Sequence, residues 1–144
     1  MPDYSEWKIK DHQYWTLFLH GESQRYLGHS YAWLRRSVRM QRLSDLTHEE
    51  LYELWKFILP QYERALDRLW CPGLINCAWL GNEFHVHGGH GHMHLIPRYE
   101  SSVPFAGLEF RDDEWGKHYE PYPKLKLPQS TLFTIRDALR KELA

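Results

Sequence analysis

Histidine is the residue type with the most unusual distribution in this sequence. Ten of the 144 residues are histidines, and five of them fall between positions 85 and 94. Three of the five, His90, His92 and His94, occupy every second position. Successive side chains of a β-strand point to opposite faces, so this spacing places three imidazoles on one face of a sheet, about 7 Å apart. Imidazole titrates near neutral pH and can act as a nucleophile, a proton donor or a metal ligand.

Three roles fit such a row of imidazoles. The first is a solvated sheet face on which histidine is merely tolerated. The second is zinc binding, because imidazole is a common zinc ligand and a catalytic zinc has three protein ligands and one open position. The third is phosphoryl chemistry, in which one imidazole attacks phosphorus and its neighbours bind the nonbridging oxygens. The residue types alone leave all three open.

The residues after the row narrow the choice, since His94 is followed by Leu95-Ile96-Pro97-Arg98. This run resembles the signature of the histidine triad (HIT) family of nucleotide hydrolases and transferases, His-x-His-x-His with two apolar residues and often Pro-Arg. Further segments resemble the family in the same order: the Gly-His strand at 27–36, the helix start Leu-Thr-His-Glu-Glu-Leu at 46–51, and a strand with an Asn-containing turn at 74–83. We therefore expect a single HIT-like domain over 1–144, in which about 14–98 match the family and 99–144 form a C-terminal extension.

The resemblance implies a nucleotide hydrolase or transferase that cleaves at an α-phosphorus, with a dinucleoside polyphosphate or a nucleoside phosphoramidate as substrate. His92 would attack the phosphorus and form a nucleotidyl-histidine intermediate. His94 would donate to phosphate oxygens, while His90 and the Gly-His residue His29 would complete the surrounding hydrogen-bond network. Neutral imidazole suits this role because it is nucleophilic and its bond to phosphorus is labile.

The same resemblance places three further residues at the site. Asn82 would contact the phosphate or the leaving group. Phe18 and Leu19 of the first hairpin are candidates for a base slot, with an ordinary core position as the favoured alternative for each. The sequence departs from the family at Gly91, where an apolar residue is usual, and in a lengthened turn over 84–89. The acidic residue that typically contacts ribose has no clear counterpart in residues 20–24.

The lengthened turn contains His85 and His87. Two other functions remain open for the protein, and the first of them uses these residues. With the triad they could form the ligand set of a metal-dependent hydrolase, they could tune the phosphate site, or they could be solvated loop residues. A non-catalytic nucleotide-binding module is the other alternative. The phosphoryl mechanism requires no metal cofactor, so zinc is not favoured.

Charge and composition restrict the partners. The formal net charge is −1, with 18 Lys and Arg against 19 Asp and Glu, so no basic field for a nucleic-acid polymer or an anionic membrane exists. Cys71 and Cys77 match no zinc or redox spacing and predict free core cysteines of a reducing compartment. With no apolar leader or membrane span in the sequence, we expect a cytoplasmic protein. The seven tryptophans and the family resemblance lead us to expect a homodimer that binds a nucleotide.

Local patterns predict the elements that hold the histidines. Aromatic and aliphatic runs at 14–20 and 30–34 indicate an antiparallel hairpin. Thr47 and Glu50 form a capping box that begins a long amphipathic helix with a kink near Pro60, and the helix ends at residues 71–73.

Two strands and a second helix follow. The apolar run 74–80 predicts a strand buried on both faces, and 90–96 predicts the histidine strand, closed by Pro97. A mostly irregular tail leads to a helix from about residue 130. The expected fold class is α+β of the HIT type: an antiparallel sheet with one long amphipathic helix and a C-terminal helix.

Overall fold

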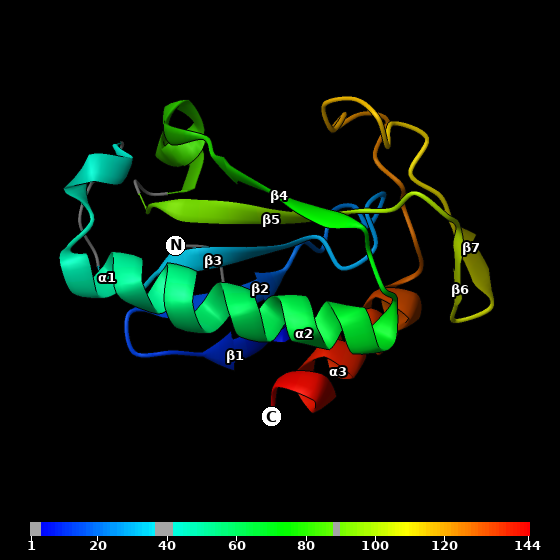
Figure 1. Ribbon diagram of the computed structural model, residues 1–144, viewed down its shortest axis with the longest axis horizontal. Coiled ribbons are helices and arrows are strands. Elements are labelled where there is room, and N and C mark those ends of the chain that lie inside the picture. The colour runs from blue at the N-terminus through cyan, green and yellow to red at the C-terminus, as the bar shows by residue number, and fades with distance from the viewer. Residues whose placement is uncertain (1–3, 37–41, 88–89) are drawn as a thin grey trace.

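A five-stranded antiparallel sheet organises the fold, with its strands in the order β1-β2-β3-β5-β4. The computed structural model describes residues 4–36, 42–87 and 90–144, except for the side chains of 85–87. The predicted α+β architecture is confirmed, because one long helix crosses a face of this sheet and a second helix ends the chain (Figure 1). The strands of the sheet are β1 (Lys8–Asp11), β2 (Trp15–Leu19), β3 (Ser30–Leu34), β4 (Leu74–Trp79) and β5 (His92–Arg98).

The predicted hairpin is present as β2 and β3, which bring the first half of the chain beside the histidine strand. Phe18 of β2 lies opposite Tyr31 of β3, and Tyr31 in turn lies opposite His94 of β5. The outer strand β1 does not follow from the sequence pattern, because Lys-Ile-Lys-Asp contains a single apolar residue. That residue, Ile9, packs into the core, so one buried side chain and the ladder with β2 define the strand.

The capping box begins the long helix as predicted. The Thr47 hydroxyl accepts a hydrogen bond from the Glu50 N–H, and the Glu50 carboxylate accepts one from the Thr47 N–H at 2.8 Å. A π-helical turn lies just before Pro60, where a wider turn suits a residue that has no N–H. The kink expected there stays a prediction. The helix consists of α1 (His48–Glu53), the π turn η3 (Leu54–Ile58) and α2 (Leu59–Leu69).

The predicted burial of residues 74–80 on both faces is wrong, because β4 is an outer strand of the sheet. Leu74 is 67% exposed. A continuous apolar run indicates a fully buried strand only where neighbours cover the edge and both faces. The position of β4 also affects Cys77, and the turn after α2 holds Cys71. Both cysteines are free, as predicted, but they are exposed rather than part of the core.

The histidine strand β5 begins and ends later than predicted. It begins at His92, so His90 precedes it, and it continues through Pro97 to Arg98. β3 begins at Ser30, opposite Leu95, so within the described part of the chain only the ladder with β4 reaches Pro97 and Arg98. A proline without an N–H is tolerated where one side of its strand has no partner.

The tail after β5 is mostly irregular, as expected, but it contains a small hairpin that the sequence pattern does not predict. Its strands are β6 (Val103–Phe105) and β7 (Leu108–Phe110). Both residues of the turn have positive φ, 53° at Ala106 and 76° at Gly107, and alanine is an unusual residue for such a turn. The predicted C-terminal helix is α3 (Gln129–Leu143).

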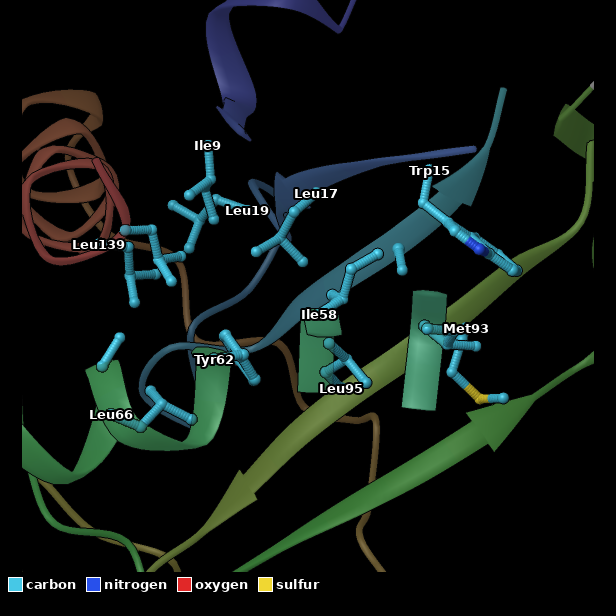
Figure 2. Close-up of a cluster of buried hydrophobic side chains, with 14 of the residues drawn as sticks. Ile9, Trp15, Leu17, Leu19, Ile58, Tyr62, Leu66, Met93, Leu95 and Leu139 are labelled. Carbon is cyan, nitrogen blue, oxygen red and sulfur yellow. The ribbon is translucent and has the colours of Figure 1, made fainter. Parts of the chain in front are cut away.

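The hydrophobic core lies between one face of the sheet and the helices. Ile58, Tyr62 and Leu66 of the long helix pack in one cluster with Met93 and Leu95 of β5 (Figure 2). Because β-strand side chains alternate, the neighbouring histidines of β5 point to the opposite face. Among the residues that the structure describes, no helix has the length and apolar character needed to span a membrane.

Candidate active site on the histidine face

The sheet face away from the core borders a cavity of about 430 Å³. This volume is typical of small-molecule sites. Cross-strand pairing builds its floor, since Trp33 lies opposite His92 and Tyr31 lies opposite His94. The short helix η4 (Gly81–His87) and the chain after β7 lie above β5 in the view of Figure 1, on the side away from the long helix.

His92 is held tightly at this floor. It is 3% exposed, and its ring stacks on Trp33 with centroids 5.2 Å apart and planes 13° apart. Phe84 of η4 contacts the same ring at 5.0 Å. The His92 Nδ1 lies 3.2 Å from the His90 carbonyl oxygen. Because a carbonyl oxygen only accepts, Nδ1 carries the proton of the neutral ring and Nε2 carries the lone pair.

His94 belongs to a second contact group, with His29 and His20. The His29 Nε2 and the His94 Nδ1 lie 3.0 Å apart and share one hydrogen bond. The His20 ring lies 4.3 Å from His29 and 6.0 Å from His94. Burial lowers the pKa of His29 well below its usual 6.5, and the nearby His20 and His94 add to this effect. His29 is therefore neutral in the folded protein at neutral pH.

His90 stands apart from the other two triad residues. Its Nδ1 lies 3.3 Å from the Leu34 carbonyl oxygen, and its ring lies 5.5 Å from Trp33. It does not line the cavity. From this position, beside the Leu34 carbonyl and the Trp33 ring, His90 can support the stacked Trp33–His92 pair.

The other predicted site residues are distributed unequally. Asn82 lies on η4 and is exposed. It does not line the cavity, although its neighbours Leu80 and Glu83 do. Phe18 is on the correct face but lies behind Tyr31, stacked on it at 5.8 Å. Leu19 points the other way and is fully buried in the core (Figure 2), because it is one residue out of phase with Phe18.

The side chains of His85 and His87 lie outside the described residues. Among the residues whose side chains are described, no group of three or more His, Cys, Asp or Glu is arranged to hold a metal ion. The zinc alternative therefore stays a prediction about the lengthened turn.

Much of the cavity wall is aromatic, and these aromatic residues were not predicted from the sequence to line a site. The available signal was the 15% content of Phe, Trp and Tyr, which pointed only to a core or a dimer interface. The wall also contains His20, Arg25 and Lys124, together with Glu22 and Glu83. The aromatic residues that line the cavity are Tyr4, Trp7, Tyr26, Tyr31, Trp33, Tyr119 and Tyr122.

Arg98, the last residue of the recognised motif, does not reach the cavity. It is 3% exposed and forms an ion pair with Asp112, with Nε 2.7 Å from Oδ2 and Nη2 3.1 Å from Oδ1. Its Nη1 also donates to the Asn76 side chain at 2.8 Å and to the Lys117 carbonyl at 2.9 Å. Arg98 thus fastens the C-terminal extension to the sheet.

The described architecture matches solved histidine triad structures. A hypothetical histidine triad nucleotide-binding protein from Sulfolobus tokodaii has a TM-score of 0.66 at 14% identity, covering 95% of this chain and 83% of that one. A histidine triad protein from Marinobacter aquaeolei has a TM-score of 0.66 at 19% identity, covering 94% and 87%. A zinc-bound histidine triad family protein from Mycobacterium smegmatis has a TM-score of 0.53 at 17% identity, covering 93% and 84%. No protein-family model and no curated protein matches the chain.

These matches establish the histidine triad fold for this chain. The fold brings His92 and His94 of the His-x-His-x-His run onto a strand that borders a ligand-sized cavity. The fold is therefore the one that the resemblance drawn from the sequence implies.

Proposed function

We propose that this protein is a nucleotide hydrolase or nucleotidyltransferase that cleaves at an α-phosphorus through a nucleotidyl-His92 intermediate. The observation that carries the proposal is the orientation of His92. The contact of its Nδ1 with the His90 carbonyl leaves the lone pair on Nε2, and the stack on Trp33 prevents the ring from turning. A nucleophile fixed in the reactive tautomer reduces the entropic cost of attack.

The reaction has two displacements. In the first, the Nε2–P bond forms while the bond from phosphorus to the leaving group breaks, and the leaving group departs with the electron pair and takes up a proton. In the second, a water or hydroxyl oxygen attacks the same phosphorus, the N–P bond breaks, and the attacking group gives up one proton. The sum with water is one nucleoside monophosphate and one protonated leaving group.

His94 and His29 supply the hydrogen bonds that this reaction needs. Neutral His29 can donate from Nε2 to the Nδ1 of His94, and the Nε2–H of His94 then faces a phosphate oxygen. Such a donor stabilises the charge that builds up on the nonbridging oxygens in the transition state. The mechanism uses no metal, and we propose that none is required.

Intact-protein mass spectrometry tests the proposal directly. The protein is mixed with adenosine 5′-phosphoramidate or a diadenosine polyphosphate, quenched, and weighed. We expect an added mass of one adenylyl group on the unmodified protein and none on His92→Asn. The matched control is His48→Asn, an exposed histidine at the start of α1 outside the cavity, which should keep both adduct and turnover.

Two outcomes would support the alternatives. Tight nucleotide binding that is unchanged by His92→Asn, with no adduct and no product, would identify a non-catalytic nucleotide-binding module. Turnover that disappears with a chelator and returns with zinc, in parallel with stoichiometric zinc by elemental analysis, would identify a metal-dependent hydrolase and draw attention to His85 and His87.

We also propose that the protein is a homodimer joined along β4. Among the described residues β4 pairs only with β5, so its other edge offers backbone groups to a second chain. Its sequence, Leu-Ile-Asn-Cys-Ala-Trp, contains no charge that would repel a second copy. Light scattering should give twice the chain mass, and Cys77→Pro, at a position whose N–H faces away from β5, should shift it toward the monomer. A monomeric mass for the unmodified protein at micromolar concentration would contradict this part of the proposal.

A further inference from the structure

Part of the cavity wall comes from the C-terminal extension. Residues 119–124, which we name the C-terminal wall, contribute Tyr119, Pro121, Tyr122 and Lys124 to the cavity lining. They are about 25 residues beyond the histidine strand in sequence, so only the fold brings them to the site. An irregular segment can recognise a ligand only if its backbone is held in one position. Contacts on both sides of the C-terminal wall hold it in this way.

The wall is anchored on its N-terminal side by Arg98. The Arg98–Asp112 pair is almost completely buried, with side-chain exposures of 4% and 1%. A third contact, from Arg98 to the Lys117 carbonyl at 2.9 Å, lies two residues before the wall begins. Breaking a buried ion pair by removing one partner is strongly destabilising, so this anchor is firm.

The wall is anchored on its other side by the loop between β2 and β3. The Arg25 guanidinium donates to the Glu120 carbonyl at 2.8 Å and also to the Tyr122 carbonyl. The Tyr26 hydroxyl accepts from the Glu120 N–H at 2.6 Å. Just past the wall, the Ser23 hydroxyl accepts from a backbone N–H at 3.1 Å. These bonds hold the wall's backbone in place.

Lys124, Glu22 and Arg25 already have partners within the protein. Lys124 pairs with Glu22, and this hydrogen bond raises the pKa of Lys124. Arg25 is used on backbone carbonyls. What the wall offers to a ligand is therefore mainly aromatic surface. Tyr119 and Tyr26 lie edge to face at 6.1 Å, while Tyr122 is 65% exposed on a backbone that Arg25 holds.

We propose that the C-terminal wall is a subsite for a planar aromatic group of the substrate, and that Tyr122 is its specificity-determining residue by stacking on that group. An exposed aromatic side chain on a fixed backbone loses little entropy when it stacks on a flat ligand. The inference rests on the proposed function, because the aromatic group is attached to the phosphorus that His92 attacks. The planar group is either the nucleobase or an aromatic leaving group, and the experiment separates these two.

The test compares two phosphoramidates of adenosine that differ only in leaving group. One carries N-benzyl, which is planar, and the other carries N-cyclohexylmethyl, which has a similar size but no flat face. The variants are Tyr122→Ala, Tyr122→Phe and the matched control Tyr52→Ala, an aromatic residue on α1 with 54% exposure outside this cavity. We expect Tyr122→Ala to lower kcat/KM by about 5-fold to 100-fold, as loss of one aromatic stack does. Tyr52→Ala should stay within about twofold of the unmodified protein, because it lies elsewhere, and Tyr122→Phe should recover most of the activity that Tyr122→Ala loses, because it keeps the stack.

Each result decides the proposal. A loss confined to the N-benzyl substrate identifies an aromatic leaving group at the wall, and an equal loss for both substrates identifies the nucleobase. No loss for either substrate, or the same loss with Tyr52→Ala, overturns the subsite.

Failure of the proposed function is recognised separately, because the unmodified protein would then turn over neither phosphoramidate. In that case AMP binding by calorimetry replaces turnover. Weaker binding to Tyr122→Ala but not to Tyr52→Ala supports the subsite, whereas equal binding to all variants, or no binding to the unmodified protein, overturns it.

Discussion

The two faces of β5 show how one short strand serves two purposes. On one face, Met93 and Leu95 are 3% and 0% exposed and pack against the long helix. On the other, His92 and His94 border the cavity and contact aromatic rings and other imidazoles. The alternation of side chains keeps the two sets of contacts separate. Substitutions on the histidine face should therefore change chemistry with little loss of stability, and substitutions on the core face should do the reverse.

The strongest test of this separation is His92→Asn. We expect turnover of a nucleoside phosphoramidate to fall by at least about 1000-fold, because the side chain that forms the bond to phosphorus is lost. The urea midpoint of unfolding should stay close to that of the unmodified protein. Initial rates and urea titrations on one preparation check both parts, and a large fall in the urea midpoint would break the comparison.

The converse substitution is Leu95→Ala on the core face. Removing a fully buried leucine leaves a cavity beside the long helix and should lower the free energy of unfolding by about 2–5 kcal/mol. In conditions where the variant stays folded, its kcat should be within a few-fold of normal. Urea unfolding with single-turnover rates measures the two effects together, and a stability change below about 1 kcal/mol would contradict the assignment of this face to the core.

A smaller effect is expected from His29, because it is buried on the histidine face and neutral. Its pKa in the folded protein is lowered by burial, with His20 and His94 adding to the shift. As pH falls below about 6.5, the unfolded chain takes up a proton that the folded chain does not, so the free energy of unfolding decreases. The slope for this one residue is at most about 1.4 kcal/mol per pH unit.

Urea titrations between pH 7.5 and 5.5 measure that slope. His29→Gln should flatten it, because glutamine does not titrate, while an unchanged slope in the variant would assign the pH dependence to other histidines. His12, whose pKa is also lowered mainly by burial, provides the comparison variant His12→Gln.

The smallest expected effect lies outside β5. Thr47→Ala removes the hydroxyl that accepts from the Glu50 N–H, and loss of such a cap costs about 1 kcal/mol. Thr47→Ser should restore most of the stability. Thermal unfolding followed by circular dichroism compares the three proteins. A Thr47→Ala effect as large as that of Leu95→Ala would mean that the core face is not the dominant source of stability.

Local patterns were sufficient to predict the elements that hold the triad. Alternation placed His92 and His94 on one face of a strand, and the capping box located the start of the long helix to the residue. The hairpin that brings His29 to His94 followed from two apolar runs and a polar connection. These signals lie within one element or between neighbours in sequence, which is why a single sequence reveals them.

The features that were missed depend on contacts between distant residues. The run 74–80 is as apolar as a buried strand, and only the strand order places it at an edge. The bond from Arg25 to Tyr122 joins residues 97 positions apart, and no periodicity predicts it. Leu19 was assigned to a base slot although the alternation that placed the triad, applied to β2 and Phe18, would have separated the two.

The π turn before Pro60 helps to keep buried side chains that recur every four residues on one face of the helix, which a regular α-helix would not do. Leu54, Ile58, Tyr62 and Leu66 are each at most 1% exposed and recur every four residues. In a regular α-helix, four residues turn about 40° beyond a full circle, so such a row would drift round the helix by about 120° over three steps. A turn with more residues per revolution reverses part of this drift. The extra residue of the π turn thus brings the apolar face of α2 back toward the sheet. Deleting one residue from 54–58 should rotate that face away from the sheet.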